Sequence, residues 1–140
     1  MKKVIYILTS LFLLFFTSCK KDDNTNTSNE DPRTKFEGTW TCKETCKKDG
    51  SFTAFPVTIS KNTSNSTEIL IANFNNLGQT DNLHAIITGY NFTIPQQSYT
   101  SSNYPVSGSG AIDSKQTSIN MNYLVNEGAQ TDEYTAVLTK

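Results

Sequence analysis

Three cysteines and one histidine are the side chains of this 140-residue chain best suited to covalent or metal chemistry. Cys42 and Cys46 stand four residues apart, and an oxidising cell envelope would permit a disulfide between such a pair. In a regular strand their Cα atoms would lie about 13 Å apart, beyond the limit of roughly 7 Å for a disulfide. A bond therefore requires the strand to curl at Cys46, and the sequence leaves two alternatives open: a disulfide or two buried free thiols.

His84 is the only histidine, and its sequence surroundings indicate no catalytic or metal-binding role. A zinc site needs several ligands, and a Cys–His nucleophile needs both side chains within hydrogen-bond reach. We therefore interpret His84 as a strand residue that faces solvent or a single polar partner. The sequence predicts no catalytic residue, no metal site and no cofactor, so we expect a protein that is not an enzyme.

The carboxylates are scattered singly or placed at turns, whereas glycoside hydrolysis needs two of them facing one cleft. Phosphate-binding loops, nucleophile elbows and His-Glu-x-x-His zinc motifs do not occur in the sequence. We interpret the following carboxylates as solvated charges: Glu44, Asp49, Glu68, Asp81, Asp113, Asp132 and Glu133.

Cys19 stands at the end of a segment typical of an export signal. Residues 1–3 are basic at two of three positions, residues 4–16 are almost entirely apolar, and Thr17-Ser18 supplies small side chains. The apolar run is shorter than the roughly 20 residues that cross a bilayer. Residues 14–19 resemble a bacterial lipobox, which implies cleavage after Ser18 and acyl chains such as palmitate on Cys19. An ordinary secretory signal peptide over residues 1–18 is the alternative.

Residues 19–34 have the composition of a flexible tether, because they are too polar to offset the entropy of ordering the chain. The tether opens with Lys21-Asp22-Asp23, which is similar to the surface-export signals of some lipoproteins of the Bacteroidetes phylum. The alternative is that these charges only keep the tether hydrated. We therefore expect a lipid anchor in the outer membrane, with both the periplasmic and the surface-exposed face left open.

The composition favours an all-β domain over residues 35–140. Ser, Thr and Asn make up about a third of the chain, and these residues favour turns and solvated strand faces over helix interiors. The formal net charge of −1 gives no electrostatic reason to bind nucleic acid. Apolar and polar residues alternate in short runs separated by turn residues, which predicts eight antiparallel strands: 40–46, 55–59, 68–74, 84–87, 89–94, 104–112, 118–125 and 133–139.

Two local features of this pattern are specific enough to test. Alternation places Trp40, Cys42, Glu44 and Cys46 on one face of the first strand. The pair of glycines in Gly108-Ser109-Gly110 indicates a bulge or a tight bend within the sixth strand. Closing the sheet into a barrel would remove two exposed edges that favour aggregation.

The order of several short motifs resembles that of the small lipocalin-like (calycin-like) lipoproteins of Bacteroidetes. The motifs are Phe36-Glu37-Gly38-Thr39-Trp40, Asn73-Phe74, Ile94-Pro95-Gln96-Gln97, Gly108-Ser109-Gly110 and Asn122-Tyr123. The resemblance covers about residues 36–140 and implies an eight-stranded antiparallel barrel or half-barrel. The C-terminal helix of full lipocalins is missing from the sequence.

Aromatic side chains are the candidate ligand contacts, since an eight-stranded barrel can enclose one small ligand. The candidates are Trp40, Phe55, Tyr90, Tyr99, Tyr104 and Tyr123, of which Tyr90, Tyr99 and Tyr104 are expected at a rim. Filling the core is their alternative role. We therefore expect a non-enzymatic, lipid-anchored envelope protein that binds a small apolar or amphipathic ligand. The competing hypothesis is a surface module with a solid core that contacts protein or glycan through its loops or an exposed face.

Overall fold

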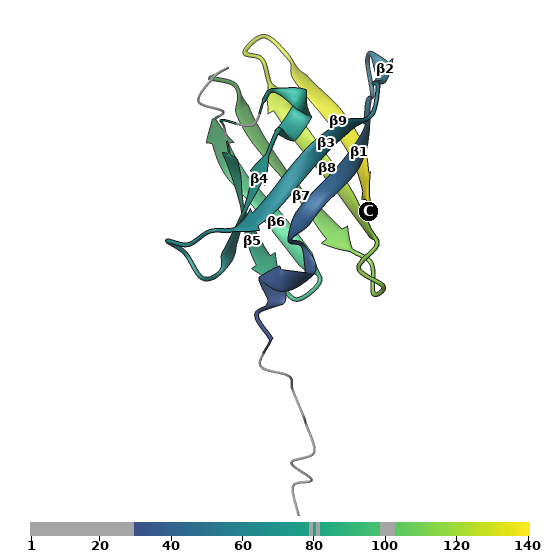
Figure 1. Cartoon of the computed structure of the whole chain (residues 1–140). Coiled ribbons are helices and arrows are strands. Elements are labelled where there is room, and N and C mark those ends of the chain that lie inside the picture. The colour runs from purple at the N-terminus through teal and green to yellow at the C-terminus, as the bar shows by residue number, and fades with distance from the viewer. Residues whose placement is uncertain (1–29, 79, 81, 99–102) are drawn as a thin grey trace, which may run out of the picture.

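The computed structural model describes residues 30–78, 80, 82–98 and 103–140. In this part of the chain the strands pair in one continuous antiparallel sheet that closes on itself (Figure 1). The strands are β1 (Gly38–Cys46), β2 (Gly50–Ser51), β3 (Phe55–Lys61), β4 (Glu68–Ala72), β5 (Asn82–Thr88), β6 (Asn91–Ser98), β7 (Pro105–Ile112), β8 (Ser118–Asn126) and β9 (Thr131–Thr139).

Strand β1 closes the barrel because it has neighbours on both sides. Its first half pairs with β3, from Gly38 to Cys42, and Thr41 to Cys46 pair with β9. The two-residue strand β2 only extends the end of β1 as a short hairpin. The expected meander of eight strands is therefore confirmed, and it forms a closed barrel rather than a half-barrel.

Alternation along each strand decides which side chains fill the barrel. In β1 the side chains of Trp40, Cys42, Glu44 and Cys46 are buried and those between them are exposed, as predicted. The same period of two residues holds in β5, β8 and β9. The largest fully buried side chains include Trp40, Tyr123, Phe36, Phe74, Ile69 and Ile71.

Most strands differ from the predicted bounds by one to four residues, and two of these differences have a clear cause in the backbone. Strand β4 stops at Ala72, two residues early, because Asn73 has a left-handed backbone with φ of 58° that cannot continue a strand. Strand β6 continues through Pro95 to Ser98, and its register with β7 shifts between Ile94 and Gln97. A proline lacks the N–H that a regular ladder needs, so it is accommodated at this irregularity.

The glycines of β7 do not produce the bulge expected within that strand. The register between β7 and β8 is uninterrupted from Val106 to Ile112. A Cβ atom on Gly108 would lie 2.5 Å from the backbone oxygen of Asn122 and 2.6 Å from the Cβ of Tyr123. Gly108 is therefore required for the close approach of β8, while the register shift lies on the other side, against β6.

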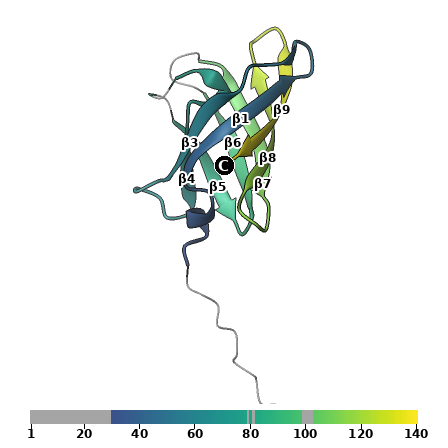
Figure 2. The same ribbon diagram turned by 45° about the vertical axis from the view of Figure 1, so that its right-hand side comes forward.

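A 3₁₀ helix, η1 (Pro32–Lys35), lies at one end of the barrel (Figures 1 and 2). The Arg33 guanidinium donates hydrogen bonds to the backbone oxygens of Asn62 and Asn65, each at 3.0 Å, in the β3–β4 loop. The following residue, Phe36, is fully buried, and its backbone oxygen accepts a hydrogen bond from the Trp40 indole at 2.9 Å. Residues 32–34 of the expected tether thus belong to η1, and η1 and Phe36 close this end of the barrel.

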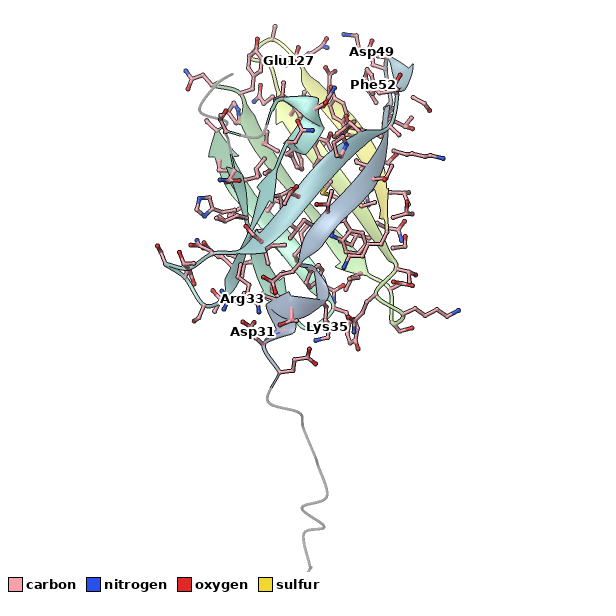
Figure 3. All side chains as sticks on the ribbon, in the orientation of Figure 1. Asp31, Arg33, Lys35, Asp49, Phe52 and Glu127 are labelled. Atoms are coloured by element: carbon pink, nitrogen blue, oxygen red, sulfur yellow. The ribbon has the colours of Figure 1, made fainter. Side chains whose placement is uncertain are left out.

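The opposite end of the barrel is formed by the β1–β2 turn, the β8–β9 loop and a second 3₁₀ helix, η2 (Phe74–Asn76). Asp49, Phe52 and Glu127 lie at this end, whereas Asp31 and Arg33 lie at the other (Figure 3). Within the described part of the chain, no helix has the length and apolar character needed to cross a membrane. We refer to the end that carries Phe52 as the mouth.

Candidate functional site

A cavity of about 520 Å³ lies at the mouth. Its volume falls within the range of roughly 300–1,000 Å³ that small-molecule sites occupy. The side chains come from β1, the segment after β2, the start of β3, η2 and β9. The lining residues are Glu44, Asp49, Phe52, Thr53, Phe55, Asn75, Asn76 and Tyr134.

A column of aromatic rings runs from this cavity into the core. Phe52 stacks on Tyr134 with centroids 6.4 Å apart, and Tyr134 stacks on Tyr123 at 4.8 Å with nearly parallel rings. Tyr123 in turn contacts Phe74 at 4.4 Å in a tilted arrangement. Phe52 is 45% exposed whereas Tyr123 and Phe74 are buried, so the outermost ring offers a free face at the mouth.

The β1–β2 hairpin fixes the position of Phe52. Gly50 has φ of 85°, which lets the chain reverse directly after Asp49. The hydroxyls of Thr45 and Ser51 hydrogen-bond across the hairpin at 3.0 Å. The backbone N–H of Phe52 then donates to the backbone oxygen of Glu44 at 2.9 Å. These bonds hold the aromatic ring above the strand that carries Glu44.

Glu44 is buried, so its interpretation as a solvated charge is wrong. The residue is only 3% exposed, and its Oε2 atom has no hydrogen-bond partner. Burial raises the pKa of Glu44, because a low-dielectric surrounding disfavours the charged carboxylate. The Tyr123 hydroxyl is close enough to oppose this rise in pKa, but it lacks a well-aligned hydrogen bond as well. Two unpaired polar groups therefore lie together beneath the cavity.

Asp132 is a second carboxylate that the sequence misassigned to solvent. It is 7% exposed at the start of β9, and the Gln130 amide donates to both of its oxygens at 2.8 and 3.1 Å. Unlike Glu44, this carboxylate is satisfied by its own loop. The mouth therefore contains one buried carboxyl group with a hydrogen-bonding partner and one without.

Three asparagines with left-handed backbones shape the η2 side of the cavity. Asn73, Asn75 and Asn76 have φ values of 58°, 52° and 55°, a region that asparagine tolerates better than most residues. The Asn73 amide donates to the backbone oxygen of Pro56 at 2.7 Å and accepts from the Gly78 N–H at 2.8 Å. This pins the loop to β3, and Asn75 and Asn76 then line the cavity.

Cys42 and Cys46 are buried free thiols in the structure, which is the second of the two alternatives. Strand β1 does not curl at Cys46, which stays in register with both Gly50 and Tyr134. Burial, reinforced by Glu44, raises the pKa of Cys42 to about 12, so the thiol is a poor nucleophile. Among the described residues, no group of three or more His, Cys, Asp or Glu side chains is placed to hold a metal ion.

The predicted ligand contacts inside the barrel lie at two different ends of it. Phe55 lines the mouth cavity, and Tyr123 lies beneath it in the aromatic column. Trp40 belongs to the closed end, where its ring is buried and covered by the Lys140 ammonium at 4.3 Å. Trp40 is therefore a core residue and not a wall of the cavity.

The expected rim of tyrosines does not form. Tyr90 lies in the β5–β6 turn at the closed end, 5.1 Å from the Lys35 ammonium. Tyr104 precedes β7 and hence lies at the opposite end of the barrel, because consecutive turns of a meander alternate between its ends. Tyr99 lies outside the described residues. Tyr104 thus lies at the mouth end but does not line the cavity, whereas Phe52, which was not among the predicted contacts, does.

His84 lies on the outer surface of β5, where its side chain contacts two polar partners, Glu68 and Asn62. Its side chain is half exposed, and Nδ1 lies 3.1 Å from Glu68 Oε2. The Asn62 amide also donates to that glutamate oxygen at 2.9 Å. His84 is thus remote in topology from Glu44 and does not form part of the mouth.

Other hollows lie on the outer surface of the barrel, and the two largest are compared with the mouth. One of about 370 Å³ lies over β7, β8 and β9 around Gly108, and one of about 530 Å³ lies along β1 and β9 beside Phe52. Both are built mainly from outward-facing strand positions. Glu44 and Phe52 also line the hollow along β1 and β9, but the mouth is the stronger candidate because it adds the buried rings of Phe55 and Tyr134 and the amides of two asparagines.

No protein-family model matches this sequence, and no curated protein shows significant similarity to it. The site is therefore assigned from geometry alone. The predicted lipid anchor Cys19 and the export signal Lys21-Asp22-Asp23 lie outside the described residues.

Proposed function

We propose that this chain is a non-enzymatic, lipid-anchored protein of the bacterial cell envelope that binds a small amphipathic ligand at the mouth of its barrel. The observation that carries the proposal is the cavity of about 520 Å³, which is lined by an exposed aromatic ring together with polar side chains. The ring of Phe52 offers a stacking surface for an apolar ligand part. Glu44, Asn75 and Asn76 offer hydrogen-bonding groups for a polar part.

The lipid anchor is proposed from the sequence, and the position of η1 on the barrel suggests how an anchored protein would be oriented relative to the membrane. Helix η1 and residue 30 lie at the closed end, opposite the mouth (Figure 1). Acyl chains on Cys19 would therefore hold the closed end toward the outer membrane and leave the mouth open to the surrounding medium. This orientation is useful on either face of the membrane, periplasmic or surface-exposed. We also propose that the chain belongs to the lipocalin-like lipoproteins of Bacteroidetes, because its lipobox and the order of its motifs resemble theirs.

Native mass spectrometry of the protein purified from its own envelope tests the binding proposal. We expect a non-covalent adduct beyond the mass of the acylated chain, lost when the protein is denatured. Phe52→Ala should reduce the adduct severalfold, because the outermost stacking surface is removed. Tyr90→Ala is the matched control, since Tyr90 is also 45% exposed but lies at the closed end.

Equal adduct levels in both variants and the unaltered protein would place any ligand outside the mouth. Substitutions such as Val137→Lys would fill the outer hollow along β1 and β9. If the adduct persists in such a variant, the ligand binds in the mouth cavity and not in that hollow. Complete lack of an adduct, together with capture of a glycan or protein by the outer surface, would favour the competing hypothesis of a surface interaction module.

A further inference from the structure

We propose that the ligand of the mouth is an organic cation: its ammonium group pairs with Glu44, and its aromatic or apolar body stacks against Phe52 and Tyr134. This inference rests on the proposed function and adds the chemical class of the ligand. It starts from an imbalance inside the barrel, where a buried acid lacks the partner that buried acids normally have.

The Glu44 carboxyl is more than nine-tenths buried, and its Oε2 atom makes no well-formed hydrogen bond with any described residue; the neutral Tyr123 hydroxyl is the donor group close to it. None of the ion pairs among the described residues involves Glu44. A hydrogen-bond donor that carries positive charge would satisfy both deficits at once, because charge-assisted hydrogen bonds are the strongest that a carboxylate forms. Glu44 is also one of the residues that line the cavity.

Among the described residues, the groups that surround Glu44 on the mouth side supply no positive charge, and Lys43, which lines the outer hollow with it, is on the opposite, exposed face of β1. The groups on the mouth side are the thiols of Cys42 and Cys46 on β1, the hydroxyls of Tyr123 on β8 and Tyr134 on β9, and the second lining carboxylate, Asp49. The nearby Lys47 ammonium is already engaged by Glu133 at 2.7 Å and is mostly exposed. Burial without a positively charged partner raises the pKa of Glu44, and a bound cation would favour its charged form.

The remaining lining residues agree with a cationic ligand. Glu44 and Asp49 would both repel a carboxylate or phosphate group, and the described lining residues include no lysine or arginine. The faces of Phe52 and Tyr134 accept an apolar ring, and aromatic faces also attract cations within about 6 Å. The amides of Asn75 and Asn76 can accept further N–H groups.

Three probes with one fluorescent ring separate the charge from the stacking. Naphthylethylamine is a cation at neutral pH, naphthylethanol is its neutral counterpart, and naphthylacetate is its anionic counterpart. We expect fluorescence titration of the full protein to show the amine binding about tenfold more tightly than the alcohol, which corresponds to about 1.4 kcal/mol. Binding of the acetate should be weaker than that of the alcohol.

Glu44→Gln should remove the preference for the amine while leaving the affinity for the alcohol within about twofold. The matched control is Glu133→Gln, which removes an exposed carboxylate on the neighbouring strand. Asp49→Asn reports on the other carboxylate of the cavity and should reduce the preference less than Glu44→Gln. Circular dichroism of each variant verifies that the barrel is folded.

The pH dependence gives a second readout. Affinity for the amine should fall as the pH is lowered, because protonation removes the negative charge of Glu44, whereas affinity for the alcohol should stay constant. Equal affinities for amine and alcohol, or a preference that survives Glu44→Gln, would overturn the inference about charge. If none of the probes binds in a way that depends on Phe52, the proposed binding function itself fails.

Discussion

Glu44 couples the stability of the barrel to pH. Its pKa in the folded protein is raised above the ordinary value of 4.5, so the folded state holds this proton more tightly than the unfolded state does. Stability from this group is fully present below pH 4.5 and is lost as the pH rises toward the raised value. The direction is opposite to that of a salt-bridged carboxylate, which stabilises at high pH.

We therefore predict that Glu44→Gln becomes more stable relative to the unaltered protein as the pH rises from 4 to 8. The free energy of unfolding should shift in its favour by about 1–3 kcal/mol, the usual cost of an unsatisfied buried polar group. Urea unfolding at the two pH values measures this change. Glu133→Gln should show no such trend, because the Glu133 side chain is exposed. A constant difference between Glu44→Gln and the unaltered protein at both pH values would contradict the burial of an unpaired acid.

The cysteines give a second prediction at the residue scale. In a Cys19→Ser variant, Cys42 and Cys46 should resist a thiol reagent at pH 8 while the protein is folded, because both are buried and the pKa of Cys42 is about 12. Denaturation without reductant should then expose two reactive thiols. Finding none would mean that the disulfide forms after all.

Among the elements, β7 has the least tolerance for added atoms. Gly108→Ala should destabilise the barrel by about 1–3 kcal/mol, because its Cβ would overlap the backbone of Asn122 and the side chain of Tyr123. Chemical denaturation measures the loss. Ser109→Ala, an exposed position of the same strand, should change stability by less than about 0.5 kcal/mol. Equal effects from both substitutions would show that β8 can move away from β7.

The strands were predictable because alternation is a local signal. The face of β1 with Trp40, Cys42, Glu44 and Cys46 follows from a period of two residues. The same pattern places Glu44 on the face of three buried residues, so alternation predicts that Glu44 is buried whereas its charge predicts that it is exposed. Composition alone suggested solvent, because a buried carboxylate is rare when it lacks a partner.

The assembly of the mouth was not predictable from local patterns. Phe52 and Tyr134 are 82 positions apart in the chain, and their stacking depends on β1 pairing with both β2 and β9. Tyr90 and Tyr104 are closer in sequence, yet the meander places them at opposite ends. Barrel closure decides which aromatic residues meet at the mouth. Closure depends on the register of whole strands, and no short sequence motif encodes that register.

At the scale of the whole molecule, the two ends of the barrel differ in what they can do. The closed end carries η1 and the Arg33 contacts to the β3–β4 loop, and the mouth carries the cavity. The proposed N-terminal lipid is therefore compatible with the proposed ligand site, because the two lie at opposite ends of the barrel.

We predict that labelled palmitate is incorporated into the full chain and that Cys19→Ser abolishes both the label and membrane association, since several acyl chains are needed for stable anchoring. The soluble variant should bind the naphthyl probes as the anchored protein does, because the mouth lies at the far end from the anchor. A membrane-bound Cys19→Ser protein would show that attachment does not depend on this cysteine. Protease treatment of intact cells then distinguishes the two faces of the outer membrane.

A crystal structure of the protein purified from its own envelope tests the central claim most directly. The account predicts electron density for a bound molecule between the ring of Phe52 and the carboxyl of Glu44, in a cavity close to 520 Å³. A mouth filled by the protein's own side chains, with Phe52 folded onto Glu44 and no space between them, would contradict it.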